Sequence, residues 1–405
     1  MNKRLMSIIM INFAGLIETS IERAEMTTIQ YNKDRLDYLL TLFGMSNEEL
    51  LSSLNDGRKK PILLENIYGE KIKVSLLKRI DEIFHKGLSF YLDFTPLPIE
   101  QKTKVFFRKS RFQSVLTMED KRLVDSFESL KGLLDGYRIL TETLSSEYPL
   151  HRSFTIEHNP KNVATQVRNI LIPRKNIQEH RQFLKAMIAN LAEINVYVFE
   201  FVETWNKREK ATIDGFYLEP NVIVLKRQKS YKREIFTLAH EIGHYLLGIE
   251  DVEALDMSKV ERNRISNRVE RWCNDFAFYL IAGDAVNELD KYKTYSEDVN
   301  FAIDKLSEST HISRMAWYTR LAYNKIVPMP YYRGIIHKLE EEQAEKLKKE
   351  KEEQKRKASN ARAPKPIVSP LYLETMQYAF YNGLVSESSF CEQLRISPKD
   401  IDRFL

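Results

Sequence analysis

Two histidines and a glutamate with metal-binding spacing lie near the middle of the chain. Residues 236–248 read FTLAHEIGHYLLG and contain the pattern His-Glu-x-x-His. Histidines four positions apart lie on one face of a helix, so His240 and His244 can bind one metal ion. Glu241 follows the first histidine, where its carboxylate can accept a proton from a water on that metal. The spacing therefore predicts a catalytic zinc site.

The residues around this pattern predict the elements that hold it. The run has the apolar stripe of a helix that packs on a core, made by Ile235, Leu238, Ala239, Ile242, Leu246 and Leu247. Gly248 follows at the position expected for a left-handed helix cap. Upstream, residues 221–225 (NVIVL) indicate a short buried strand, and Asp214-Gly215 before it indicate a turn.

A catalytic zinc site needs a third protein ligand and keeps one position open for water. No further histidine follows at a ligand spacing, so the candidates are carboxylates: Glu250, Asp251, Glu253, Asp256, Glu261, Glu270 and Asp275. The first four lie too close to the histidine helix to swing back easily. Glu270 borders the apolar face of a second predicted helix, formed by Val269, Trp272, Cys273, Phe276, Ala277 and Leu280. We expect Glu270 to be the third ligand, with Glu261 as the alternative.

The two helical patterns together resemble the ImmA/IrrE family of metallopeptidases. The second helix of that family typically reads Glu-x-x-Ala-Asn-x-Phe-Ala, and residues 270–277 match it with Cys273 at the alanine position. The segment from Gly215 to Leu225 resembles the strand that precedes the family's active-site helix. The resemblance covers roughly residues 165–330. It implies a zincin-like fold with His240, His244 and Glu270 as metal ligands and Glu241 as general base.

The resemblance also implies a substrate and hence a function. Members of the family cut repressor proteins of phages or mobile elements, and some act in stress responses or beside toxin–antitoxin genes. We therefore expect a zinc-dependent endopeptidase of narrow specificity whose partner is a transcriptional repressor or an antitoxin-like protein. The alternative is a regulatory protein that binds DNA or a partner and has a structural or vestigial metal site. An intact Glu241 favours the enzyme, because a structural site does not need it.

Some features of the expected site stay open at this stage. Zn²⁺ is the first choice, but two histidines and one carboxylate can also hold manganese or iron. Tyr245, Tyr217 and His311 are candidate donors to an oxyanion, although each also suits packing or a surface position. A substrate strand could pair with an edge of the sheet that contains residues 222–225.

Composition predicts a cytoplasmic protein of two or three domains. The 405 residues have 43% hydrophobic content and a formal net charge of +5, which is too mild to indicate a nucleic-acid partner. Two cysteines, Cys273 and Cys391, fit a reducing compartment. The apolar run from Leu5 to Ile17 is shorter than the ~20 residues needed to span a bilayer. We therefore expect it to pack on the protein and expect no membrane partner.

The fold class predicted is α+β, a zincin-like domain with mainly helical regions on both sides. The expected divisions are an apolar helix at 1–30, a helical domain at 31–150, the metallopeptidase domain at 151–335, a charged helical linker at 336–366 and a helical segment at 367–405. The helical domain weakly resembles a phage-repressor helix-turn-helix, with Ser46 and Glu49 at capping-box spacing. DNA is a possible partner there but not the favoured one.

A second helical pair is predicted at residues 299–324, with its turn at Thr310–Ser313. The following run resembles a recognition helix, in which Arg314 and Arg320 are candidates for phosphate contact. A scaffold helix that buries Trp317 and Leu321 is the better interpretation.

Overall fold

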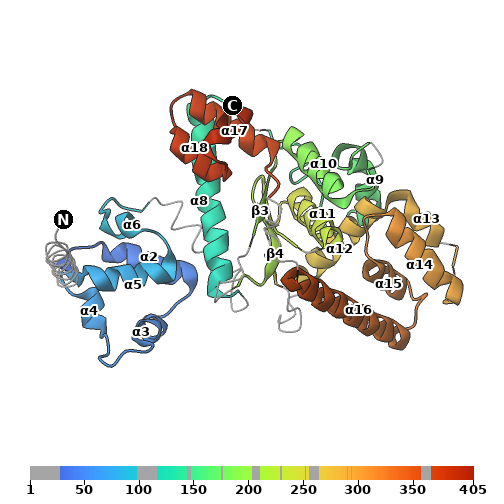
Figure 1. Cartoon of the computed structure of the whole chain (residues 1–405), viewed down its shortest axis with the longest axis horizontal. Helices are drawn as coiled ribbons and strands as arrows, with labels where there is room; N and C mark the ends of the chain where they lie inside the picture. Colours follow the sequence, from blue (N-terminus) through green and yellow to red (C-terminus); the bar gives the residue numbers. More distant parts are fainter. Residues whose placement is uncertain are drawn as a thin grey trace, which may run out of the picture. The chain divides into compact units, whose positions relative to one another are not determined.

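A computed structural model describes most of the chain. The described residues are 28–97, 116–143, 147–174, 177–202, 210–228, 230–250, 252–254, 264–289, 291–292, 294–356 and 366–405. The chain divides into two compact units, residues 1–124 and 125–405. Helices predominate and the described strands form two small sheets, which confirms the α+β class (Figure 1). The helix predicted at 1–30 lies outside the described residues except for its last three, of which Thr28–Ile29 form strand β1.

The first unit is a small helical domain. Its helices are α2 (Lys33–Phe43), α3 (Asn47–Asn55), α4 (Leu64–Tyr68), α5 (Val74–Phe84) and α6 (Leu88–Leu92), and β1 pairs antiparallel with β2 (Ile72–Lys73). The predicted capping box is present, because Ser46 Oγ accepts from the Glu49 amide and Glu49 Oε2 accepts from the Ser46 amide. The core contains Leu36, Leu39, Phe43, Leu50, Ile67, Ile80 and Phe84.

A four-stranded sheet lies at the centre of the second unit. Its strands are β3 (Tyr197–Phe201), β4 (Ile213–Leu218), β5 (Val222–Lys226) and β6 (Val252–Ala254), in the order β3-β5-β4-β6. β3 and β5 are parallel, and the other neighbours are antiparallel. The strand predicted at 221–225 is confirmed as β5, and it lies inside the sheet. The turn predicted at Asp214-Gly215 is wrong, because both residues belong to β4 and Gly215 pairs with Leu225.

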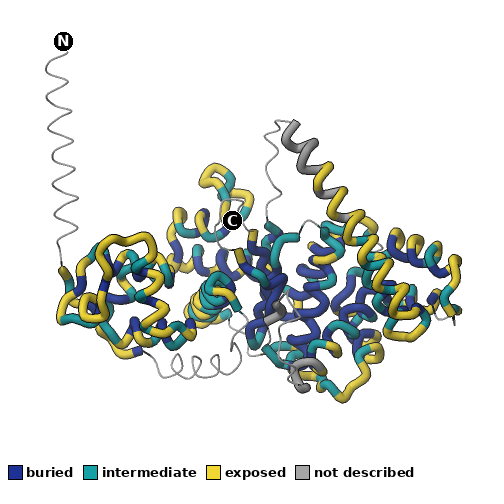
Figure 2. The backbone as a smooth tube through the Cα atoms, turned by 90° about the horizontal axis from the view of Figure 1, so that it is seen from below, coloured by how far each residue is buried: buried dark blue, intermediate teal, exposed yellow. Residues whose placement is uncertain are grey.

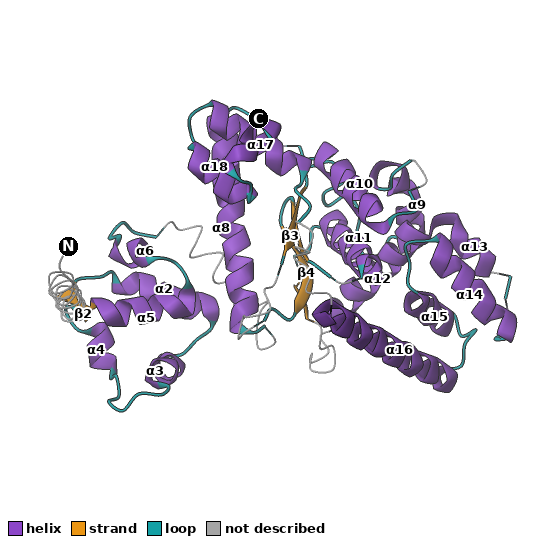
Figure 3. Ribbon diagram, viewed as in Figure 1, coloured by secondary structure: helices purple, strands orange, loops and turns teal. Residues whose placement is uncertain are grey.

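Helices cover both faces of this sheet (Figure 3). On one side lie α10 (His180–Glu193), α11 (Tyr231–Leu247) and α12 (Arg264–Ala282), with α9 (Pro160–Leu171) packed on α12. On the other side lies α8 (Met118–Leu140), whose Phe127 ring is 5.6 Å from Phe199 and 6.0 Å from Phe216, centroid to centroid. The most deeply buried part of the unit is therefore the sheet and the helix α11 (Figure 2).

The sequence pattern explains why α11 is buried on nearly every side. All of its residues from Thr237 to Leu247 are buried, including both histidines and Glu241. At its end Gly248 has φ 63°, the left-handed conformation predicted for it, and its amide bonds back into the last turn. The helix packs most extensively on α12. Gly243 permits this contact, because a Cβ there would lie 3.0 Å from Cys273 Sγ and 3.1 Å from Cys273 Cβ.

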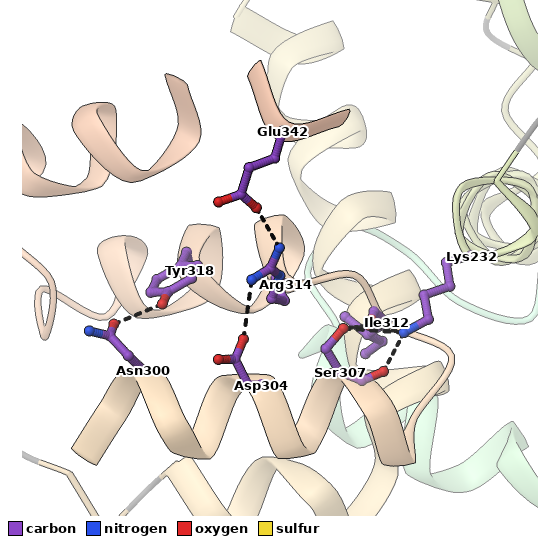
Figure 4. Close-up of polar contacts among 8 residues, drawn as sticks. All are labelled: Lys232, Asn300, Asp304, Ser307, Ile312, Arg314, Tyr318 and Glu342. Carbon is purple, nitrogen blue, oxygen red and sulfur yellow. Dashed lines mark hydrogen bonds and ion pairs between the residues drawn. The ribbon is translucent and has the colours of Figure 1, made fainter. Parts of the chain in front are cut away.

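A helical module follows α12 and supports it. Its helices are α13 (Val286–Leu289), α14 (Glu297–Ser309), α15 (Arg314–Tyr323) and α16 (Met329–Arg356). Arg314 bonds Asp304 of α14 and Glu342 of α16, as Figure 4 shows. Arg320 bonds Asp275 of α12 at 2.7 Å and stacks over Phe278. Because both arginines are used inside the unit and Trp317 and Leu321 are buried, α15 is a scaffold helix.

The C-terminal segment docks on β3 and α10. It contains α17 (Pro370–Tyr381), α18 (Glu387–Leu394) and a final 3-10 helix, η2 (Pro398–Arg403). The Thr375 hydroxyl is 2.8 Å from the Tyr197 hydroxyl, and the Ile367 amide donates to Glu200. None of the helices among the described residues is long and apolar enough to cross a membrane.

Replacement of Gly243 by alanine should force α11 and α12 apart. We expect Gly243→Ala to lower the free energy of unfolding by about 1–3 kcal/mol, the usual cost of overpacking a core, and to weaken metal binding. Chemical denaturation measures the first effect. Gly136→Ala on α8 is the control, since a Cβ there meets nothing within 4 Å, and it should be neutral or stabilising. Equal effects of the two substitutions would contradict the close-packing explanation.

Candidate metal centre

The three predicted ligands lie together between α11 and α12. The Nε2 atoms of His240 and His244 are 3.2 Å apart. The Glu270 carboxylate of α12 faces both, with Oε2 3.2 Å from His240 Nε2 and Oε1 3.3 Å from His244 Nε2. The two histidines are each only 1% exposed. Three ligand atoms that converge in this way form a group able to hold one divalent metal ion.

Two further contacts orient the histidine rings. His240 Nδ1 lies 3.0 Å from Asn274 Oδ1, and His244 Nδ1 lies 3.0 Å from the carbonyl oxygen of Ile249. An oxygen acceptor at Nδ1 holds the ring proton there and leaves the Nε2 lone pair for a metal. The positions of the three side chains and the protonation state of the two imidazoles are therefore both suited to binding a metal ion. The sequence reasoning did not predict these orienting contacts, although Asn274 lies one helical turn after Glu270 and so shares its face.

The charge of Glu270 also suits a cation. Burial by itself would raise the pKa of its carboxyl group, but hydrogen bonds from His240 and His244 and their charges outweigh burial. The net result is a pKa well below the usual range. Glu270 is therefore an anion at neutral pH and needs to lose no proton when a metal binds.

The other carboxylates considered as ligands lie elsewhere or outside the described residues. Glu250 Oε1 accepts from the Glu219 amide at 2.7 Å, and Asp275 bonds Arg320. Glu253 belongs to β6. Asp251, Asp256 and the alternative ligand Glu261 fall outside the described residues. Among the described residues the only cluster with metal-ligand spacing is the predicted one.

Glu241, the predicted general base, is 1% exposed and points toward the sheet. Its Oε1 lies so near β4 that a Cβ on Gly215 would be 3.2 Å from it. The candidate oxyanion donors are bonded to other groups. The hydroxyl of Tyr245 donates to the carbonyl of Pro149, that of Tyr217 to the carbonyl of Pro220, and His311 contacts His180 and Ile177. None of the three predictions gains support from these contacts.

A buried acidic pair anchors the first turn of α11. Glu234 is fully buried beside Glu200 of β3. Burial, followed by the hydrogen bond and the charge of Glu200, raises the pKa of Glu234 from 4.5 to about 9, and Arg227 only partly opposes this. Arg227 in turn bonds both carboxylate oxygens of Glu200, at 2.8 and 3.1 Å. Glu234 is therefore protonated at neutral pH.

The sheet, the histidine helix and the facing carboxylate of α12 define a domain of the zincin-like class. Residues 192–321 match the Peptidase M78 family, described as the IrrE N-terminal-like domain. This match supports the resemblance to the ImmA/IrrE family of peptidases that the two helical motifs predicted. The match runs from the end of α10 to α15, so it includes the sheet and both ligand helices. No curated protein and no solved structure matches the chain significantly.

Removal of the carboxylate ligand should weaken zinc binding more than removal of an orienting contact. We expect Asn274→Ala to lower zinc affinity by about 10–100-fold, as is usual for an outer partner, and Glu270→Ala to lower it further. Competition against a chromophoric chelator measures both. Glu297→Ala, which removes an exposed carboxylate from α14, is the matched control and should change nothing. An undiminished affinity in Glu270→Ala would exclude Glu270 as a ligand.

The protonated Glu234 should make stability fall as pH rises. The pKa of Glu234 is higher in the folded state than in the unfolded state, so protonated Glu234 stabilises the fold. This contribution is complete below pH 4.5 and is lost as pH rises through about 9. Glu234→Gln removes the titrating proton but keeps a hydrogen-bond donor. We expect the variant to be more stable than wild type at about pH 9, by about 1–3 kcal/mol. Urea unfolding across this pH range is the measurement, with Glu297→Gln as control, and a wild-type slope retained in Glu234→Gln would refute the assignment.

Proposed function

We propose that the chain is a zinc-dependent endopeptidase of narrow specificity. The observation that carries the proposal is the convergence of His240, His244 and Glu270 on one point, with Glu241 next to His240 on the same helix. A purely structural metal site would be closed by four ligands, whereas three protein ligands leave a position for a reacting water. The family match to a peptidase domain supports the same function.

The residues divide the chemistry between them. Zinc bound there would supply Lewis-acid polarisation of the scissile carbonyl and a nucleophile at neutral pH. Glu241 receives the proton that the attacking water loses and delivers it to the leaving amine. Glu241 is buried, so few solvent molecules compete with its carboxylate for that proton. Asn274 and the Ile249 carbonyl hold the two imidazoles in register during these steps.

The sheet order limits the strand edges with which an extended substrate segment can pair. β5 has a neighbour on each side, so the strand first considered for substrate pairing has no edge to offer. Of the two outer strands, β6 directly follows the metal helix and pairs only with β4 among the described strands. We propose that the substrate adds a strand to the outer edge of β6. By the family resemblance, the substrate is a transcriptional repressor or an antitoxin-like protein.

The alternative function, regulatory binding to DNA, receives less support. Residues 28–97 contain ten lysines and arginines and ten aspartates and glutamates, so this region lacks the net positive charge of a DNA-binding domain. Its α4, which lies where a repressor would place its recognition helix, has five residues. The balanced charge and the short α4 both favour a domain that binds protein over one that binds DNA.

Substitution of the general base tests the proposed reaction. Purified protein is incubated with zinc and with the repressor encoded beside its gene, and cleavage is followed by gel electrophoresis and mass spectrometry. We expect Glu241→Gln to slow cleavage by about 10²–10⁴-fold, the usual contribution of general base catalysis, while zinc affinity stays within a few-fold of wild type. Glu297→Gln should cleave normally, and a chelator should stop the reaction.

Two outcomes would decide against the proposal. Equal cleavage by wild type and Glu241→Gln would remove Glu241 from the chemistry. Tight binding to operator DNA, without cleavage of any neighbouring protein, would favour the regulatory alternative.

A further inference from the structure

Gly215 occupies an unusual position for a glycine, because it lies in the middle of a buried strand. Its φ is not in the left-handed region, so backbone conformation does not require glycine there. It pairs with Leu225 in the regular β4–β5 ladder. Glycine weakens a strand interior and usually marks a bulge or a close approach by another group. The β4–β6 pairing is irregular between Ile213 and Phe216, and a close approach is present at Gly215 as well.

The approaching groups belong to α11. A Cβ on Gly215 would lie 2.6 Å from Thr237 Cγ2, 3.1 Å from the Val224 carbonyl oxygen and 3.2 Å from Glu241 Oε1. The first distance is a clash, and the third requires the carboxylate to move by a few tenths of an ångström. Thr237 and Glu241 are one helical turn apart, so both point at the same part of β4. The missing side chain of Gly215 thus makes the space into which these two side chains fit.

We propose that Gly215 is a positioning residue that sets where the Glu241 carboxylate lies. The absence of a side chain on Gly215 allows the Glu241 carboxylate to approach β4. The methyl group of Thr237, a residue that is 6% exposed, fills the space on the neighbouring turn of α11. Glu241 is then restricted on the sheet side by β4. A general base must be held near its productive geometry, because small displacements reduce the rate strongly.

The inference rests on the proposed role of Glu241 but makes a separate claim about sterics. A simpler explanation is that Gly215 only accommodates the Thr237 methyl group. The two explanations differ for the double variant Gly215→Ala/Thr237→Ser. Serine lacks Cγ2, so the clash at 2.6 Å disappears, whereas the contact at 3.2 Å with Glu241 remains.

The test uses the zinc-loaded full chain and acetohydroxamate, a small chelator that binds the metal and gives its hydroxyl proton to an adjacent carboxylate. Calorimetry measures its affinity for wild type, Gly215→Ala, Thr237→Ser and the double variant. We expect Gly215→Ala to lower hydroxamate affinity by about 10-fold or more, in line with a sub-ångström misplacement, without a change in zinc affinity. The double variant should regain part of the thermal stability lost in Gly215→Ala, since the contact with the Val224 carbonyl remains, but not the hydroxamate affinity, and Thr237→Ser alone should bind hydroxamate like wild type.

Crystal structures of the same variants give a second readout that needs neither zinc nor a substrate. The Glu241 carboxylate should be displaced from β4 in Gly215→Ala and in the double variant, but not in the control Gly136→Ala. Full recovery of hydroxamate affinity by the double variant, or an unmoved carboxylate, would overturn the inference. If wild type bound no zinc, the proposed function would fail, and the position of Glu241 in the crystals would still decide the inference. If Gly215→Ala does not fold, the double variant alone provides the comparison.

Discussion

The contact between α11 and α12 is the constraint on which the rest of the site depends. Two ligands come from one helix and the third from the other, so their convergence requires the helix axes to lie unusually close. Gly243 faces Cys273 at that contact and leaves no space for a larger residue. The glycine inside the His-Glu-x-x-His pattern therefore acts on the metal centre through packing, while its neighbours act through chemistry. The polar site is held by an apolar, close-packed interface.

The elements around this interface fix the two helices from outside. Arg320 bonds Asp275 one residue after Asn274, and Lys232 donates from the first turn of α11 to the carbonyl oxygens at the α14–α15 turn (Figure 4). The module that resembled a DNA-recognition pair thus supports both ligand helices. Arg314 and Arg320, the two arginines of the recognition-helix pattern, face acidic groups of the same unit.

Local spacing made the metal centre predictable, and long-range packing set the limit of prediction. His240, Glu241 and His244 follow from helix periodicity, and Glu270 from the amphipathic face of a second helix. The role of Asn274 depends on how α11 and α12 pack, and the role of the Ile249 carbonyl depends on how the chain turns after Gly248; neither follows from a single periodic pattern. Asp214-Gly215 was assigned to a turn because glycine usually marks one. In the structure, side chains of α11, 22 residues or more downstream, approach β4 closely at Gly215. The position of β5 inside the sheet likewise depends on the strand order, which the local pattern does not contain.

The attachment of the Ile367 amide to Glu200 has a consequence for the architecture of the chain. Glu200 also accepts hydrogen bonds from Arg227 and shares a buried environment with Glu234. Residues from β3, from the position after β5, from α11 and from the start of the C-terminal segment therefore meet at one carboxylate. A cut in the chain before residue 366 would leave a desolvated anion short of a donor in the floor of the catalytic domain. The C-terminal segment and the histidine helix therefore share one buried polar cluster, and part of this cluster lies outside the residues 192–321 that match the peptidase family.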